Sequence, residues 1–252
     1  MSEGPIRPPS PAISWQLPQL FWRYSCAPRA TGPVAGVSAQ ADSNVTSAKQ
    51  DAASRPIIVY VNIAAALRGA TIVLDDRAIL RGLDLDIGPG LTLLRGSNGS
   101  GKTTLLRAIA GLIPLARGSR TVTTSLLSIG HRPQLLRGLS ARENLCFFAA
   151  FRGVSTDQVD PALSFWGIAG PLARRPVETL SAGQRRRAAL ARIDSEGASL
   201  VLLDEPFGEL DEAATALLRD ALARLTRRSA AVVVATHGHH ELDGDAAQVV
   251  QL

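Results

Sequence analysis

The chain has 252 residues and a net charge of +5 at pH 7, with 46% hydrophobic and 19% charged residues. This is the composition of a globular protein, and the length suits one sizeable domain with an appendage, or two small domains. No apolar run approaches the roughly 18 residues that span a bilayer, so we expect any membrane role to be performed from outside the lipid. The positive charge forms no basic stripe with interleaved aromatic residues, which argues against a nucleic-acid partner.

The first 56 residues differ from the rest of the chain. Seven prolines between Pro5 and Pro33 interrupt any helix, and small and polar residues fill the gaps. We therefore expect residues 1–56 to be a disordered or non-native extension, and residues 57–252 to be the functional domain. Three interpretations of the extension stay open: a disordered tail, an Arg-containing, acid-poor transit peptide, or a stretch upstream of the start that the cell uses.

From residue 57 onward, the apolar pattern predicts alternating strands and helices. We expect strands at 57–64, 71–75, 83–87, 91–94, 125–129, 199–203 and 230–235, and helices at 101–112, 182–194 and 211–226. Residues from about 139 to 180 are predicted to form a compact helical part, with an aromatic core of Phe147, Phe148, Phe151, Phe165 and Trp166. Alternating strands and helices favour a mainly parallel sheet that is covered on both faces.

The strongest local signal is a stretch of the form G-x-x-x-x-G-K-[ST], which follows a predicted strand and opens a predicted helix. In that setting backbone N–H groups surround an anion at the helix N-terminus, so the stretch is predicted to bind nucleotide phosphates. Lys102 is expected to reach the β- and γ-phosphates, and the Thr103 hydroxyl to bind Mg²⁺. The predicted nucleotide-binding residues are Gly96, Ser97, Asn98, Gly99, Ser100, Gly101, Lys102, Thr103 and Thr104.

Two acidic residues, Asp204 and Glu205, follow the apolar run from Leu200 to Leu203. A buried parallel strand brings such residues to the carboxyl edge of the sheet, where open α/β folds bind ligands. We expect Asp204 to hold Mg²⁺ with Thr103, directly or through water, and Glu205 to act as general base toward an attacking water. The alternative is a plain acidic turn, and the phosphate loop upstream argues against it.

A third motif, Leu180-Ser181-Ala182-Gly183-Gln184, precedes three arginines and a predicted helix. A hydroxyl residue and a glycine at a helix start form another anion site, and its distance in sequence from the phosphate loop indicates that it serves a different nucleotide. The motif resembles the signature of ABC ATPases, usually Leu-Ser-Gly-Gly-Gln. The resemblance implies that Ser181, Ala182, Gly183 and Gln184 close over ATP held by a second subunit, so that the functional unit is a dimer.

Further positions match the same family. Asp211 lies in a segment that looks like the D-loop, and His237 resembles the switch histidine, which contacts the γ-phosphate and helps to order the attacking water. Arg132 departs from the family, because the resemblance implies the glutamine of the Q-loop at that position. Gln134 lies two residues further on and is the alternative for that role.

The resemblance covers residues from about 60 to 252. Together with the signature, the stretches 129–133 and 139–145 make the chain most similar to the haem-exporter type of ABC ATPase used in cytochrome c maturation. This implies an α/β fold: a P-loop NTPase ABC cassette with a mainly parallel core sheet, an N-terminal antiparallel β part and a small helical subdomain at about 139–180.

The same resemblance implies a function. We expect a subunit that binds and hydrolyses ATP with Mg²⁺, paired with a second cassette and with multi-spanning membrane subunits, at the cytoplasmic face of the inner membrane. Two distant cysteines, Cys26 and Cys146, predict no disulfide framework and fit a reducing compartment. Export of haem or a related factor for cytochrome c biogenesis is the expected role. The alternatives are the motor of another bacterial exporter and a soluble ABC ATPase outside transport.

Overall fold

The computed structural model describes residues 63–238 and 240–252, which all belong to one unit, Val61–Leu252. The expected extension at 1–56 and most of the strand expected at 57–64 lie outside the described residues. The strands are β1 (Ala65–Leu74), β2 (Arg77–Ile87), β3 (Gly90–Arg95), β4 (Arg117–Val122), β5 (Leu126–Ile129), β6 (Leu200–Asp204), β7 (Ala231–Ala235) and β8 (Ala246–Gln251). The helices are α2 (Lys102–Ile109), α3 (Ala141–Phe151), α4 (Val159–Phe165), α5 (Ala182–Leu190), α6 (Arg192–Glu196) and α7 (Glu212–Arg227), with 3₁₀ turns at Thr156–Gln158, Leu172–Arg174, Val177–Thr179 and His240–Asp245.

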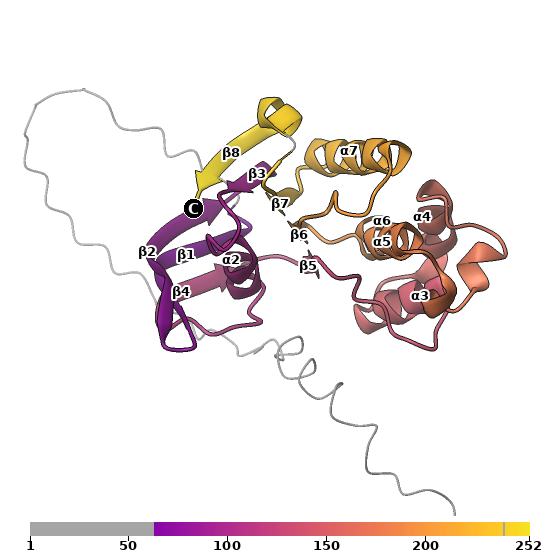
Figure 1. The fold of residues 1–252 in the computed structure, drawn as a ribbon, viewed down its shortest axis with the longest axis horizontal. Coiled ribbons are helices and arrows are strands. Elements are labelled where there is room, and N and C mark those ends of the chain that lie inside the picture. Colours follow the sequence, from indigo (N-terminus) through magenta and orange to yellow (C-terminus); the bar gives the residue numbers. More distant parts are fainter. Residues whose placement is uncertain (1–62, 239) are drawn as a thin grey trace, which may run out of the picture. The chain divides into compact units, whose positions relative to one another are not determined.

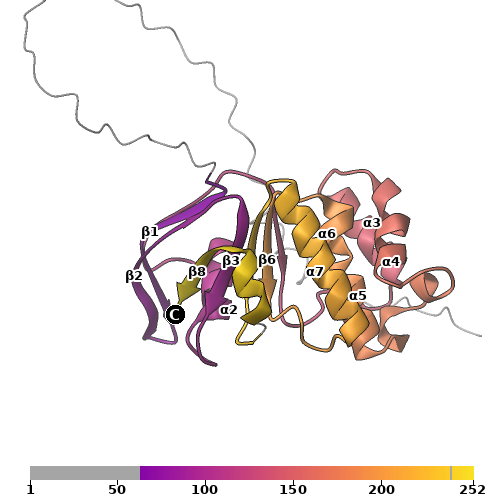
Figure 2. The ribbon, with the colours of Figure 1, turned by 90° about the horizontal axis from the view of Figure 1, so that it is seen from above.

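Two sheets form the body of this unit (Figure 1). One is antiparallel with the strand order β2-β1-β4. The other has the order β5-β6-β7-β3-β8, and its neighbouring strands pair in parallel. Helix α2 packs between the two sheets, and α7 packs on the opposite face of the parallel sheet (Figure 2). The carboxyl ends of the parallel strands therefore meet at one edge, next to the start of α2.

The inner strand β6 is buried on both faces, and its residues divide between two apolar cores. Leu200 and Leu202 pack with β1, β2 and α2, whereas Val201 and Leu203 pack with α7 and the helical part. Alternate residues of a strand point to opposite faces, so an inner strand of this kind needs an apolar residue at every position. This explains the run that ends at Asp204 and delivers its carboxylate to the edge of the sheet.

The helical part contains α3, α4 and α6. Helix α3 begins with a capping box, in which the Ser140 side chain accepts from the N–H of Glu143 and the Glu143 carboxylate accepts from the N–H of Ser140 at 2.8 Å. Trp166 is fully buried, as expected for the aromatic core. Two members of the predicted core were wrong, because Phe147 and Phe151 are 47% and 38% exposed. They stack on each other on the outer face of α3.

The expected fold class is confirmed, with a parallel core sheet, an antiparallel sheet and a set of helices. The helix expected at 182–194 is divided into α5 and α6 at Ala191. Strands β4 and β8 were not predicted, because most of their residues are exposed and their sequences do not alternate between apolar and polar side chains. In the described part of the chain, no helix is both long enough and apolar enough to cross a bilayer.

Candidate functional site

The predicted phosphate loop lies between β3 and α2, at the carboxyl end of a parallel strand. Its first residue, Gly96, has a φ of 151°, a value that residues with a Cβ rarely adopt. A Cβ atom there would lie 2.5 Å from Oγ of Ser100 and 2.7 Å from the carbonyl oxygen of Leu252. Gly101, the N-cap of α2, has a φ of 102°. Glycine is therefore required at both ends of the loop by the shape of the backbone itself.

The side chain of Lys102 lies inside this loop. Lys102 is only 7% exposed, and its Nζ donates to the carbonyl oxygens of Gly96 at 2.8 Å and Ser97 at 3.0 Å. A buried ammonium needs such partners, and they keep its charge next to the backbone N–H groups at the start of α2. A phosphate bound to the loop would therefore meet one full positive charge and the positive end of a helix dipole.

The hydroxyl of Thr103 faces the carboxylate of Asp204. Thr103 Oγ1 lies 2.9 Å from Oδ2 and 3.1 Å from Oδ1 of Asp204, to which it donates a hydrogen bond. Hydroxyl and carboxylate oxygens suit Mg²⁺, which usually takes only one or two protein ligands besides water and phosphate oxygens. No cluster of three or more His, Cys, Asp or Glu side chains within 63–238 and 240–252 suits a metal ion. The Thr103–Asp204 pair therefore fits the predicted Mg²⁺ site, with phosphate and water as the other ligands.

Glu205 directly follows β6 and has an uncommon backbone conformation, with a φ of 44°. Its N–H donates to the carbonyl of Ala235 at 2.9 Å, and its Oε1 lies 3.0 Å from Nδ1 of His237. The side chains of Glu205 and His237 are 25% and 62% exposed, so water reaches both. A carboxylate that can accept a proton from water thus lies beside an imidazole at the same sheet edge as Asp204.

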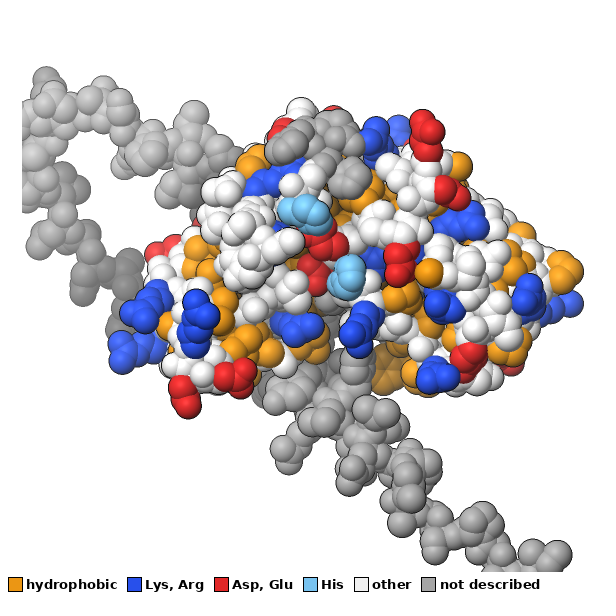
Figure 3. Space-filling view, viewed as in Figure 1, with side chains coloured by type: hydrophobic (Ala, Val, Ile, Leu, Met, Phe, Trp, Pro, Cys, Tyr) orange, Lys and Arg blue, Asp and Glu red, His pale blue; other side chains and the backbone are white. Residues whose placement is uncertain are grey.

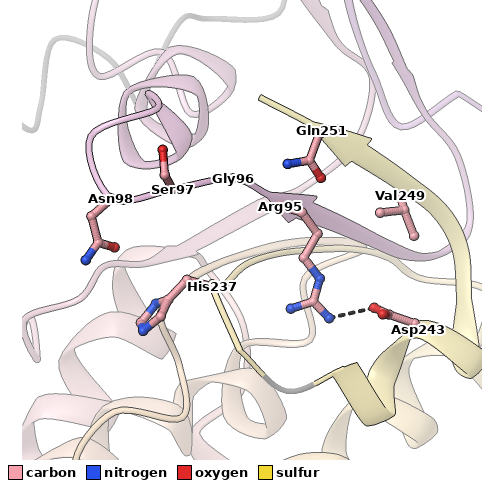
Figure 4. Close-up of a pocket in the computed structure, with 8 residues that line it drawn as sticks. All are labelled: Arg95, Gly96, Ser97, Asn98, His237, Asp243, Val249 and Gln251. Carbon is pink, nitrogen blue, oxygen red and sulfur yellow. Dashed lines mark hydrogen bonds and ion pairs between the residues drawn. The ribbon is translucent and has the colours of Figure 1, made fainter.

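A hollow of about 550 Å³ opens beside the phosphate loop. It is lined by Arg95, Gly96, Ser97, Asn98, His237, Asp243, Val249 and Gln251 (Figure 4). Arg95 points across it, with Nη2 2.6 Å from Oδ1 of Asp243 and Nη1 donating to the carbonyl of Gly238. On the face of the molecule drawn in Figure 3, acidic and histidine side chains lie next to one another, with basic side chains around them. Because Gly238 directly follows His237, Arg95 restrains the backbone that carries this histidine.

The predicted signature residues begin α5 and do not line this hollow. Ser181 and Gln184 form a capping box: Ser181 Oγ accepts from the N–H of Gln184 at 3.2 Å, and Gln184 Oε1 accepts from the N–H of Ser181 at 2.9 Å. Ala182 is exposed. A Cβ atom on Gly183 would lie 3.0 Å from the carbonyl oxygen of Glu209. The polar residues of the motif thus cap the helix, and its glycine allows close contact with the segment that follows Glu205.

Two further predicted positions, Asp211 and Arg132, follow other elements of the fold. Asp211 is the N-cap of α7, where its Oδ1 accepts from the N–H of Ala214 at 2.7 Å. Arg132 follows β5 and is exposed. A Cβ atom on Gly130 would lie 3.3 Å from Nε2 of Gln134, so the glutamine amide lies against the backbone at the end of β5.

Two arginines near the site, Arg95 and Arg186, were not predicted from the sequence as site residues. Arg186 is 1% exposed, and its guanidinium donates to backbone carbonyls around Glu205. It is the middle one of three consecutive arginines, so the sequence alone does not say which of them points inward. Arg95 ends an apolar strand and belongs to no motif. For Arg95 the available signal was an arginine at the end of an otherwise apolar strand, which calls for a buried acceptor.

Comparison with known proteins gives a family and several relatives. Residues 80–208 match the ABC transporter family. The chain is 40% identical over 182 residues to the cytochrome c biogenesis ATP-binding export protein CcmA of Rhodospirillum rubrum, covering 67% of this chain and 78% of that protein. It is also 40% identical to the CcmA proteins of Ruegeria pomeroyi, over 173 residues and 83% of that protein, and Salmonella typhi, over 176 residues and 84% of that protein.

Solved structures of ATP-binding cassettes have the same fold. The ATP-binding cassette MJ0796, in a dimeric post-hydrolysis state with ADP and Pi, matches with a TM-score of 0.67 and 20% identity. The match covers 75% of this chain and 94% of that one. An ATP-binding subunit of an ABC transporter matches with a TM-score of 0.69, also at 20% identity. The parallel sheet with its phosphate loop is thus the fold of these cassettes.

Proposed function

The chain belongs to the ABC transporter family, and on that premise we propose that it is the ATP-hydrolysing subunit of an exporter that serves cytochrome c biogenesis. One observation carries the ATPase part of the proposal. The Thr103–Asp204 pair and the Glu205–His237 pair lie at the same sheet edge, next to the loop that surrounds Lys102. This combination offers a place for phosphates, a place for a divalent cation and a base for water.

The phosphates of ATP bind where the loop backbone and Lys102 meet. Lys102 exchanges its contacts with the carbonyls of Gly96 and Ser97 for contacts with β- and γ-phosphate oxygens. Ser97, Asn98 and Gly99 form the exposed tip of the loop and Thr104 its inner end, so their N–H groups complete the surroundings of the anion.

Mg²⁺, when held by Thr103 and Asp204, neutralises charge on the phosphates. Glu205 accepts a proton from a water molecule as its oxygen attacks the γ-phosphorus, and the bond to the β–γ bridging oxygen breaks to leave ADP and phosphate. His237 hydrogen-bonds to the Glu205 carboxylate and orients it toward that water. Positioning and electrostatic stabilisation account for most of the rate enhancement in phosphoryl transfer, so this mechanism needs no covalent nucleophile.

We propose that two copies of the cassette act together. Residues Ser181–Gln184 do not line the hollow beside the phosphate loop of their own chain. This supports a role for them at the nucleotide of a second copy, with Asp211 close to the same contact. The dimeric arrangement of the similar cassette MJ0796 with ADP and Pi supports the same assembly.

The relatives named for cytochrome c biogenesis and ATP-binding export support the cargo part of the proposal, since the chain spans 78% to 84% of their length. Export needs a path through the lipid, so the cassette works with separate multi-spanning membrane subunits at the cytoplasmic face of the membrane. Haem or a related factor is the cargo that the resemblance implies.

Two substitutions test the catalytic assignment because they should fail differently. Lys102→Ala removes the ammonium inside the loop and should weaken MgATP binding. Glu205→Gln keeps the shape of the side chain but removes the base, so ATP should bind while hydrolysis falls by about 10²- to 10⁴-fold. Size-exclusion chromatography with MgATP should then show a lasting dimer for Glu205→Gln and none for Lys102→Ala.

The control is Arg107→Ala, which removes an exposed cation from the same helix and should change neither binding nor hydrolysis. Hydrolysis of ATP by Glu205→Gln at the wild-type rate would contradict the assignment of the base. A chain that binds no MgATP at all would contradict the proposed function as a whole.

A further inference from the structure

Arg186 is a charged side chain in the interior of the cassette. It is 1% exposed and lies on α5, just after the predicted signature. Its three guanidinium nitrogens donate to five backbone carbonyls: Nε to Pro206 at 3.3 Å, Nη1 to Gly130 at 2.7 Å and His131 at 3.2 Å, and Nη2 to Glu205 at 2.8 Å and Asp204 at 3.2 Å. Only the planar fork of arginine supplies donors in so many directions at once.

These carbonyls belong to two segments that end neighbouring parallel strands. Residues 204–206 comprise the last residue of β6 and the two that follow it, including the predicted base, while residues 130–131 follow β5 and lead to Arg132. Neither segment continues into a helix, so its carbonyls need partners other than a regular ladder. Arg186 supplies those partners to both segments and fixes their separation.

The contact with Glu205 matters most, because the backbone of this residue is strained. A φ of 44° is costly for a residue with a Cβ and persists only where surrounding contacts impose it. The N–H of Glu205 donates to the carbonyl of Ala235 at 2.9 Å, and the Glu205 carbonyl accepts from Arg186 at 2.8 Å and from the N–H of Gly208 at 3.3 Å. The direction of the Glu205 carboxylate, and with it the contact to His237, therefore depends on these bonds, of which the one from Arg186 is the only one made by a side chain.

Helix α5 contacts the same segment a second time through its first turn. Gly183 lies against the carbonyl of Glu209, and Arg186, three residues later, lies on the same face of the helix. One face of α5 thus runs along residues 204–209 and carries the signature at its exposed N-terminus. A shift of that N-terminus moves Arg186, because a helix of nine residues behaves as one rigid element.

We propose that Arg186 is a positioning residue that links the signature of each subunit to the base of the same subunit. Under the proposed function, on which this inference rests, the signature contacts the nucleotide of the second copy. Closure over that nucleotide presses on α5, and Arg186 passes the displacement to the Glu205 backbone. The base in one site then becomes aligned when the other site is occupied.

The charges around Arg186 fit this role. Burial lowers the pKa of its guanidinium, and the carboxylates of Glu209, Asp204 and Glu205 raise it. Arginine stays protonated under such conditions, so the five bonds persist at every pH at which the protein is folded. The contacts of Arg186 therefore change when the helix moves and do not change with pH.

The test compares Arg186→Gln with Arg186→Lys in the full chain. The glutamine variant should lower kcat for MgATP by about 10- to 100-fold, the range for loss of a residue that orients a catalytic group, with KM unchanged within error. Lysine keeps the charge but not the fork, and should restore part of kcat. Amide hydrogen exchange should rise in residues 203–210 and 129–134 of the glutamine variant and not elsewhere.

The matched control is Arg192→Gln. Arg192 is also buried, at 7% exposure, but pairs with Glu196 in the helical part. Its loss should lower Tm without changing kcat or the exchange of residues 203–210. An unchanged kcat in Arg186→Gln, or an increase in exchange spread over the whole chain as in a merely less stable protein, would overturn the proposal.

The link between the two sites needs one more comparison. Glu205→Gln with MgATP should show slower exchange at 203–210 when it dimerises. The double variant Arg186→Gln Glu205→Gln should still dimerise but lose that protection, and equal protection in both would refute the link. If wild-type chain hydrolyses no ATP, the proposed function fails, while the exchange of Arg186→Gln alone still decides whether this arginine holds the two segments.

Discussion

Replacement of Glu196 by alanine should destabilise the helical part strongly. The Glu196 side chain is 0% exposed, and its Oε1 lies 2.5 Å from Nε of Arg192 while its Oε2 pairs with Nε of Arg152. Arg152 also donates to the carbonyl of Leu126 in β5. The three charges therefore tie the end of α3 and the short helix α6 to the parallel sheet.

The magnitude follows from how little water reaches this network. The side chains of Arg192 and Arg152 are 8% and 22% exposed, so solvent cannot replace the lost carboxylate fully. Removal of one partner from a buried ion pair costs about 3–5 kcal/mol, because the other charge stays buried without compensation. Burial lowers the pKa of the Arg192 guanidinium, and the Glu196 carboxylate raises it. The carboxylate therefore stabilises the charged form of Arg192, and its removal leaves that charge buried. For a domain of this size, the cost corresponds to a fall in Tm of about 6–20 °C.

Thermal unfolding followed by circular dichroism measures this effect, with Asp160→Ala as the matched control. Asp160 pairs with Arg142 on α3 through side chains that are 62% and 45% exposed, and an exposed pair contributes less than about 1 kcal/mol. Glu196→Gln, which keeps the volume, separates the loss of charge from the loss of packing. If Glu196→Ala lowers Tm no more than Asp160→Ala does, the reasoning from burial is refuted.

Two further predictions concern Arg132 and the N-terminal extension. Arginine has no acceptor and cannot bind Mg²⁺, so Arg132→Gln should leave ATPase activity equal or higher and should lower the Mg²⁺ concentration needed for the half-maximal rate. Gln134→Ala should change little in either measurement. If Arg132→Gln abolishes hydrolysis while the Mg²⁺ dependence stays unchanged, the prediction is contradicted. Deletion of residues 1–55 should leave Tm and ATP hydrolysis within error of the full chain, because this proline-rich sequence can bury too little apolar surface to offset the conformational entropy lost on ordering. A large loss of either would show that the segment packs on the cassette.

The parts of the fold that could be predicted are those in which the local sequence pattern and the tertiary structure require the same type of residue. Gly96 must be glycine both for the phosphate loop and for its contact with the carbonyl of Leu252. Leu200–Leu203 must be apolar because both faces of β6 are buried. Ser181 and Gln184 suit a helix start on local grounds alone, since they cap α5 with each other.

The parts that could not be predicted depend on distant partners. Strands β4 and β8 pair with the edges of β1 and β3, and most of their own residues are exposed. Phe147 and Phe151 have the composition of a core, but their positions on α3 face outward. Arg186 is indistinguishable in sequence from Arg185 and Arg187 until the direction of α5 is known, and that direction is a property of the whole fold.

The hydrogen bonds that the site residues already make among themselves indicate at which step ATP binding releases free energy. Lys102 already has two carbonyl partners and Thr103 already donates to Asp204, so MgATP exchanges internal bonds for new ones and does not fill empty positions. Each such exchange yields less than the full strength of the new bond, because the bond that it replaces is lost. Under the proposed function, the loop N–H groups contact ATP in each single chain, whereas the signature of a second copy contacts it only on dimer closure. The free energy of the signature contacts is therefore released at the step that would move a membrane partner.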